Sequence, residues 1–377
     1  MTIVSPSRRV VFIDLARAIA VLMMVQGHTI DTLLAPAYRT GAGYDGWLFL
    51  RGLTSCTFLT LSGVAFSVTA IRHWEDQLRM SARWFRRVRR FVFFLALGYL
   101  MRFPMGKFSH LQWATDERWQ SWFVVDILHV VALTLLLLQG LIWAARTPRA
   151  FAVASGVLGI LVVLLSPFAW KIDWTAFVPL AVASYLSPEW GSIFPALPWA
   201  GYILLGAAFG VVLDRWIRHD SIAHMARVLV TTGVVVVAAV WVGRLLFLAP
   251  YGNIPMQVSP GFFLLRLACV LVLLGAIAAL SAKWRGLPPV VQSLAEESFL
   301  IYAVHVAILY GSRWNPGLRL IVGPQEPGVV LLWIAMLLVA MTTLAFVWNQ
   351  LQLRRPDLAI IFRVATVSAL VYPFLGE

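Results

Sequence analysis

The chain of 377 residues is 60% hydrophobic and only 12% charged, with a formal net charge of +13. Its mean hydropathy of +0.82 excludes a soluble globular domain, because one core cannot bury so much apolar surface. The basic excess does not indicate a nucleic-acid partner, since the arginines lie in short segments between apolar runs, as in membrane proteins. The two cysteines, Cys56 and Cys269, are scattered inside apolar runs, so we expect no metal centre.

Apolar runs long enough to cross a bilayer repeat along the whole chain. They predict an all-α polytopic integral membrane protein with about eleven (ten or eleven) transmembrane helices, since each crossing needs about 20 residues. We expect a single membrane domain over residues 1–377, because neither linkers nor internal repeats divide the sequence. The predicted spans are 11–34, 47–71, 87–103, 121–145, 149–169, 194–213, 228–248, 261–282, 290–311, 328–349 and 357–375.

The basic residues predict how the chain is oriented. The N-terminal segment, with Arg8 and Arg9, and the loops after even-numbered spans hold most arginines and lysines, whereas the opposite loops hold few, such as Arg39 and Arg313. Cytoplasmic segments carry such an excess, so the N-terminus is predicted to be cytoplasmic. The first apolar run is too long for a signal peptide and lacks an A-x-A cleavage site, so we expect it to be retained.

The first span, residues 11–34, carries Asp14, Arg17, His28 and Asp31. At about 100° per residue these positions fall within a sector roughly 100° wide, so they share one face. Ionisable side chains are costly in hydrocarbon, and such a stripe predicts a polar cavity. In the alternative, the two aspartates lie at the interfaces and Arg17 snorkels, which leaves only His28 unexplained. Histidine exchanges a proton near neutral pH, so His28 is the leading candidate for a general base.

The second span and the loop after it add basic candidates. Arg51 enters from the outer side, level with His28, where it could bind an anionic group or balance Asp31. The hydroxyl side chains that follow, Ser62 among them, fit close helix packing. Residues 73–90 predict an interfacial helix rich in arginine, including Arg86 and Arg87. Anionic lipid headgroups suffice to explain it, and a phosphate-bearing cytoplasmic ligand is the alternative.

Polar pairs occur again in the fourth and ninth spans. Asp126 and His129 are one helical turn apart near an outer end, where they form a hydrogen-bonded pair or simply lie at the interface. In the ninth span, Tyr302 and His305 share one face, and a buried polar cluster is the functional interpretation.

Glycines mark the sixth span, residues 194–213. Gly206 and Gly210 form a small-xxx-small element. Such an element predicts close packing against another helix.

Several stretches resemble two related families of membrane acyltransferases. Asp14-Leu-Ala-Arg17 followed after ten residues by His28, and Ser62-Gly63 within FLTLSGVAFS, are similar to bacterial membrane acyltransferase family three. The second span departs from that family's signature by beginning Arg51-Gly-Leu-Thr. DILHVVAL, FPALPWAGYILLGAAFG and SFLIYAVH are similar to the heparan-alpha-glucosaminide N-acetyltransferase catalytic domain. The resemblance runs from Arg9 to about residue 310.

The resemblance implies transfer of an acyl group, commonly acetyl, from cytoplasmic acyl-CoA to a hydroxyl or amine of a sugar or glycan on the other side of the membrane. His28 would act as base or acyl carrier. The resemblance thus assigns a catalytic role to His28 and a donor role to Arg17. Taken together with the polar residues described above, we expect a catalytic set of His28, Arg17 and Asp14 and CoA binding by Arg17, Arg86 and Arg87. The residues expected to contact the acceptor are Arg51, Ser62, Asp126, His129, Tyr302 and His305. The expected location is the bacterial inner membrane, with lipid, acyl-CoA and a carbohydrate as partners, no nucleic acid, and the oligomeric state left open.

A transporter or a flippase for a lipid-linked sugar is the rival interpretation. In that case the same charges would line a substrate path. Secondary transporters typically show inverted repeats, and the sequence shows no matched pair of halves. Spans interrupted by glycine and proline, such as 194–213, keep the rival open.

Overall fold

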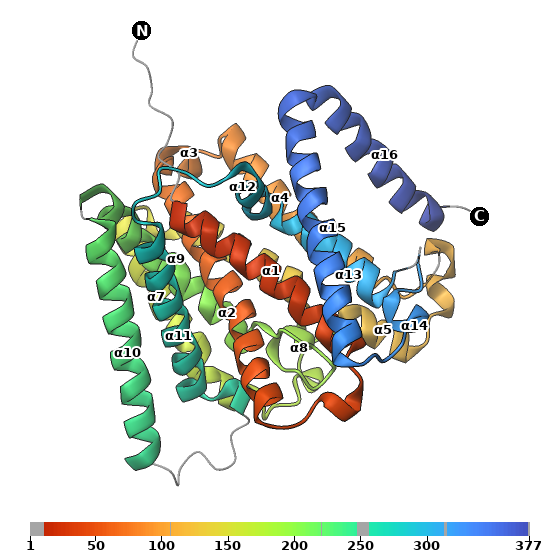
Figure 1. Cartoon of the computed structure of the whole chain (residues 1–377), viewed down its shortest axis with the longest axis horizontal. Helices are drawn as coiled ribbons and strands as arrows, with labels where there is room; N and C mark the ends of the chain where they lie inside the picture. Colours follow the sequence, from red (N-terminus) through yellow and green to blue (C-terminus); the bar gives the residue numbers. More distant parts are fainter. Residues whose placement is uncertain (1–10, 106, 220, 247–255, 313–314, 376–377) are drawn as a thin grey trace. The chain divides into compact units, whose positions relative to one another are not determined.

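The computed structural model describes residues 11–105, 107–219, 221–246, 256–312 and 315–375, and these are almost entirely helical (Figure 1). Within these ranges β-pairing is limited to isolated bridges, such as that between Leu34 and Gln325. Arg8, Arg9 and Arg313 lie outside the described residues. The α-helices are α1 Val11–Leu33, α2 Ala42–Ile71, α3 Trp74–Leu78, α4 Ala82–Met101, α5 Asp116–Phe123, α6 Ile127–Ala145, α7 Pro148–Ala169, α8 Leu180–Leu186, α9 Ala196–His219, α10 Ile222–Leu246, α11 Pro260–Ser281, α12 Pro289–Glu296, α13 Ser298–Tyr310, α14 Leu318–Ile321, α15 Pro327–Arg354 and α16 Pro356–Leu375, and short 3-10 turns cover Pro36–Tyr38, Phe108–Trp113, Trp174–Ala176 and Met256–Val258.

Eight of the described helices are long and apolar enough to cross a membrane, namely α1, α2, α6, α7, α9, α10, α11 and α15. The prediction of an all-α polytopic membrane protein is confirmed, whereas the count of about eleven spans is not. The third predicted span became α4, whose first turns carry five arginines in RWFRRVRR. The ninth is broken at Glu297, where α12 and α13 meet at a bend of 73°, and this bent pair would make a ninth span.

The described residues form two compact units. The terminal unit contains the described residues within Met1–Ser55 and Ala276–Gly376, and the central unit contains those within Cys56–Gly275. The chain passes from one unit to the other within α2 and within α11. The single domain expected from the sequence stays a prediction.

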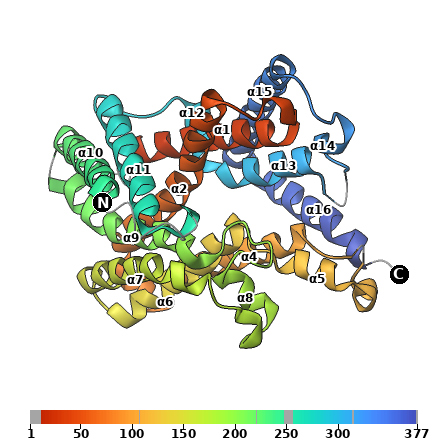
Figure 2. The ribbon, with the colours of Figure 1, turned by 90° about the horizontal axis from the view of Figure 1, so that it is seen from below.

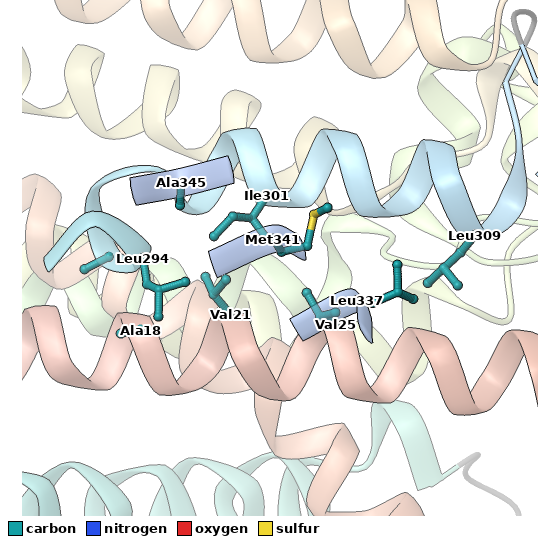
Figure 3. Packing of buried hydrophobic residues seen from close by; sticks show 10 residues of the cluster. Ala18, Val21, Val25, Leu294, Ile301, Leu309, Leu337, Met341 and Ala345 are labelled. Carbon is teal, nitrogen blue, oxygen red and sulfur yellow. The ribbon is translucent and has the colours of Figure 1, made fainter. Parts of the chain in front are cut away.

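In the terminal unit, α1 packs against α12, α13 and α15. Figure 3 shows the buried side chains of these helices pointing toward one another. This core comprises Ala18, Val21, Val25, Leu294, Ala295, Ile301, Leu309, Leu337, Met341 and Ala345. The end of α1 is capped by Arg39, whose guanidinium donates to the carbonyl oxygens of Asp31 and Leu34, each at 2.9 Å. Arg39 thereby satisfies carbonyls that the helix end would otherwise leave unpaired.

In the central unit, α6, α7 and α9 lie side by side (Figure 2). The second half of α2 crosses α9 at glycines. A Cβ added to Gly63 would overlap the carbonyl oxygen of Ile203, and a Cβ on Gly210 would lie 2.9 Å from the carbonyl oxygen of Val64. Ser67 Oγ also donates to the Ala207 carbonyl at 2.7 Å. The close packing predicted from the small-xxx-small element is therefore confirmed.

Candidate active site

The polar stripe of α1 is covered by α13 at two points. Near the start of α1, Arg17 Nη1 lies 3.8 Å from Asp14 Oδ1. Its Nη2 donates to Ser298 Oγ at 3.3 Å, and Ser298 is the first residue of α13. Arg17 is thus held between Asp14 of its own helix and Ser298 at the N-terminus of α13.

Further along α1, His28 meets His305 of α13. The two imidazoles stack with ring centroids 5.1 Å apart, and His28 Nδ1 lies 2.9 Å from His305 Nε2. Tyr310 presents its ring edge-on to His28 at 5.9 Å. His305 is fully buried, and its Nδ1 lies 2.6 Å from the carbonyl oxygen of Ile301. We call His28 and His305 the histidine pair.

The hydrogen bonds of the histidine pair define where the protons lie. A carbonyl oxygen only accepts, so His305 Nδ1 carries the proton that bonds to Ile301. With both imidazoles neutral, His305 Nε2 is then an acceptor, and His28 Nδ1 donates to it. His28 Nε2 therefore keeps its lone pair, which can accept a proton or attack a carbonyl carbon.

The two contacts also show that α1 and α13 run in the same direction. Arg17 meets Ser298, and the later residue His28 meets the later residue His305. The eleven residues from Arg17 to His28 extend about 16 Å at about 1.5 Å per residue. The parallel arrangement agrees with the predicted topology, in which the first and ninth spans cross in one direction.

Arg51 forms an ion pair with Asp31, which is one of the two roles expected for it. Its guanidinium also lies 5.9 Å from the centroid of the Trp47 ring. The aliphatic stem passes Gly27, where an added Cβ would lie 3.2 Å from Arg51 Cγ. Gly27 thus leaves room for an arginine beside the neighbouring His28.

The terminal unit therefore brings together Asp14, Arg17, His28, Arg51, Tyr302 and His305. Tyr302 faces His305 with ring centroids 5.9 Å apart, so the predicted shared face is confirmed. Gly27 and Tyr310 were missed. A glycine directly before the candidate base, and a tyrosine five residues beyond His305, were the available signals.

The other predicted site residues belong to the central unit, and there they make local contacts. Ser62 Oγ donates to the Phe58 carbonyl of its own helix at 2.8 Å. Asp126 and His129 form a capping box at the start of α6, and Arg102 Nη2 donates to Asp126 Oδ1 at 2.9 Å. Of the two alternatives for Asp126 and His129, the hydrogen-bonded pair is thus present, and it begins α6. Roles in acceptor binding stay predictions for these residues.

Next to this cap, Tyr99 connects His129 with Tyr185. The Tyr99 and His129 rings are 4.4 Å apart, and the Tyr99 and Tyr185 hydroxyls are 3.1 Å apart. Burial, and then the hydrogen bond to Tyr99, raise the pKa of Tyr185 above its ordinary value, so Tyr185 stays protonated.

In the part of the chain that the structure describes, no three His, Cys, Asp or Glu side chains gather to hold a metal ion.

Comparison with known families places the chain among membrane-bound acyltransferases. The matching family model is described as Heparan-alpha-glucosaminide N-acetyltransferase, catalytic; it covers residues 9–248, and the chain belongs to this family. No curated protein and no solved structure matches the chain. The resemblance to the heparan family is confirmed, and that to acyltransferase family three is not shown. His28 lies inside the matched region, whereas His305 lies beyond it.

Proposed function

We propose that the chain transfers an acetyl group from cytoplasmic acetyl-CoA to a hydroxyl or amine of a sugar or glycan on the extracytoplasmic side of a bacterial inner membrane. The family to which it belongs is named for N-acetyl transfer to heparan-alpha-glucosaminide, which favours an amino sugar as acceptor. One observation carries the catalytic assignment: His305, fixed by the Ile301 carbonyl, accepts from His28 Nδ1 and leaves His28 Nε2 as a base.

The proposed step moves one proton and exchanges one bond. The acceptor nitrogen or oxygen forms a bond to the thioester carbonyl carbon, the C–S bond breaks, and His28 Nε2 takes the acceptor's proton. The CoA thiolate leaves and recovers that proton from the imidazolium. In the alternative order, His28 Nε2 attacks the thioester carbon first, and the C–S bond breaks to release the CoA thiolate. The acceptor then attacks the acyl-imidazole, the bond from the acyl carbon to Nε2 breaks, and the acceptor's proton goes to the thiolate. The lone pair of His28 Nε2 is used in both reaction orders.

The surrounding charges have proposed roles as well. Arg17, held by Asp14 and Ser298 at the predicted cytoplasmic end of α1, orients the donor. Arg51, paired with Asp31 at the predicted outer end, contacts the acceptor.

The dependence of His28 on His305 gives a direct test. In an assay of labelled acetyl transfer from acetyl-CoA to glucosamine, His305→Ala is expected to lower kcat about 10²-fold with KM little changed, because the base loses its fixed tautomer. His305→Gln should recover much of the rate, since its amide oxygen accepts from His28 Nδ1. A purified wild-type protein that transfers no label would refute the function. An alanine variant as active as wild type, or a glutamine variant no better than alanine, would refute the role of His305.

A second candidate is solute transport, and the break between α12 and α13 favours it. Broken helices that carry polar groups are typical of secondary transporters. Here the bend of 73° occurs beside Glu296 and Glu297. Asn349 Nδ2 donates to Glu296 Oε2, and Gln352 Nε2 donates to Glu297 Oε1, each at 2.7 Å. These hydrogen bonds hold both carboxylates against α15. The break is therefore explained by helix packing and does not require transport.

A further inference from the structure

A cavity of about 320 Å³ in the central unit gathers four arginines. It lies where the last turn of α2 meets α3 and the start of α4, within residues 69–90. Its volume is at the lower end of the range for small-molecule sites. We call it the arginine cavity, and it is lined by Thr69, His73, Gln77, Arg83, Arg86, Arg87 and Arg90.

Arg83 lies in the first turn of α4, the end of a helix that least favours positive charge, and Arg86 and Arg87 follow in the second turn. The helix begins at Ala82 and has no acidic residue in its first turn. A helix N-terminus carries a partial positive charge from its unpaired N–H groups, so cations there are destabilising and anions stabilising. Arg83, Arg86 and Arg87 therefore add to an existing positive potential, and a bound anion would relieve both.

Nearby carboxylates balance little of this charge. Asp76 Oδ2 pairs with Arg83 Nη1 at 2.9 Å, and Glu75 pairs with Arg79, which does not line the cavity. Within the described residues, neither Arg86 nor Arg87 forms an ion pair with a carboxylate. The cavity thus holds an excess of positive charge.

His73 adds a further donor. Its Nδ1 is in hydrogen-bond contact with Arg83 Nη1, and a guanidinium can only donate. His73 Nδ1 is therefore the acceptor, and the proton of the imidazole lies on Nε2.

Arg87 supplies the second, independent observation. Its Nη2 donates to the Phe66 carbonyl at 3.1 Å, and its guanidinium lies 4.2 Å from the Phe66 ring centroid. These contacts fix the side chain in place. Its Nη1 is buried and has no hydrogen-bond partner among the described residues. A buried donor without an acceptor costs free energy, and an acceptor oxygen that reached Nη1 would recover that cost.

We propose that the arginine cavity binds a phosphate group, with Arg86 and Arg87 donating to its oxygens and His73 and Arg90 completing the set. Guanidinium groups suit phosphate because they offer parallel N–H donors to its oxygens. The phosphate belongs to the nucleotide end of CoA or to an anionic lipid headgroup, and the chemistry of recognition is the same. Only assignment to CoA rests on the proposed function.

The test compares two substitutions in α4, each of which replaces one arginine by an uncharged residue. Arg86→Gln removes a cavity arginine, whereas Arg89→Gln removes a likewise exposed arginine of α4 that does not line the cavity. Each full-length protein is placed in phosphatidylcholine nanodiscs, and CoA binding is measured by titration calorimetry. In parallel, each protein in detergent is equilibrated with vesicles containing phosphatidylglycerol, and the bound phosphatidylglycerol is quantified by mass spectrometry.

If CoA is the source, Arg86→Gln should weaken CoA binding about tenfold, while Arg89→Gln changes it less than twofold. If a headgroup is the source, Arg86→Gln should instead lower bound phosphatidylglycerol relative to Arg89→Gln. Arg90→Gln should have the same effect on binding as Arg86→Gln. Agreement between the two variants excludes a folding defect of one of them as the cause. Equal behaviour of Arg86→Gln and Arg89→Gln with both probes would overturn the proposal. CoA binding does not require transfer, so a protein without acetyltransferase activity would leave this result intact.

Discussion

Replacing His28 by alanine is expected to lower the rate of acetyl transfer by about 10²–10⁴-fold, the usual contribution of a positioned general base. The variant loses the only ring nitrogen of the histidine pair whose lone pair is not engaged by the pair's own hydrogen bonds, since His305 uses both of its nitrogens in hydrogen bonds to Ile301 and His28. CoA binding should persist, because the substitution removes no positive charge. The measurement is labelled acetyl transfer by membranes that contain equal amounts of each protein.

His224→Ala provides the matched control. His224 is exposed on α10 in the central unit, and the same substitution there should leave transfer at the wild-type rate. Transfer by His28→Ala at the rate of this control would rule out His28 as base and as acyl carrier.

Replacing Gly63 by valine should have the largest effect on stability. The added Cβ would overlap the backbone of α9 at Ile203 and lie 2.7 Å from the backbone nitrogen of Ala207. Backbone atoms cannot rotate away as a side chain can, so α2 and α9 must separate. We expect a loss of about 3 kcal/mol of unfolding free energy, seen as a lower Tm of the detergent-solubilised protein.

Gly140→Val tests whether the loss of unfolding free energy comes from the close packing of α2 on α9. Gly140 lies on an exposed face of α6, and an added Cβ there would have no heavy atom within 4 Å. It also places a β-branched residue in a helix, so it carries the same change in helix propensity. If both variants lowered Tm equally, close packing of α2 on α9 would not be the cause.

Much of the fold could be predicted because lipid imposes simple rules on sequence. Apolar runs of about 20 residues predicted the spanning helices, and the spacing of Gly206 and Gly210 predicted a close crossing. The bend at Glu297 could not be predicted. The run SLAEESFLIYAVHVAILY contains neither proline nor glycine, and the bonds from Asn349 and Gln352 that hold the two glutamates come from a helix far along the chain.

The individual residues of the candidate site could be predicted, but only some of the contacts between them could. His28 and Arg17 stood out because ionisable residues on an apolar helix are costly. The partner of His28 is His305, 277 residues away, and helical periodicity relates only residues within one helix. His305 was predicted to contact the acceptor, which stays a prediction, and its contact with the candidate base was not predicted. Arg102, which binds Asp126, was likewise not among the predicted site residues.

The central claim, acetyl transfer across the membrane, is tested most directly in proteoliposomes that separate donor and acceptor. Acetyl-labelled CoA is supplied on one side and glucosamine on the other, and both compartments are analysed by mass spectrometry. We predict labelled N-acetylglucosamine in the glucosamine compartment and free CoA in the donor compartment, with no product from His28→Ala. Unmodified glucosamine crossing the bilayer while the label stays on CoA would contradict the account and favour a transporter.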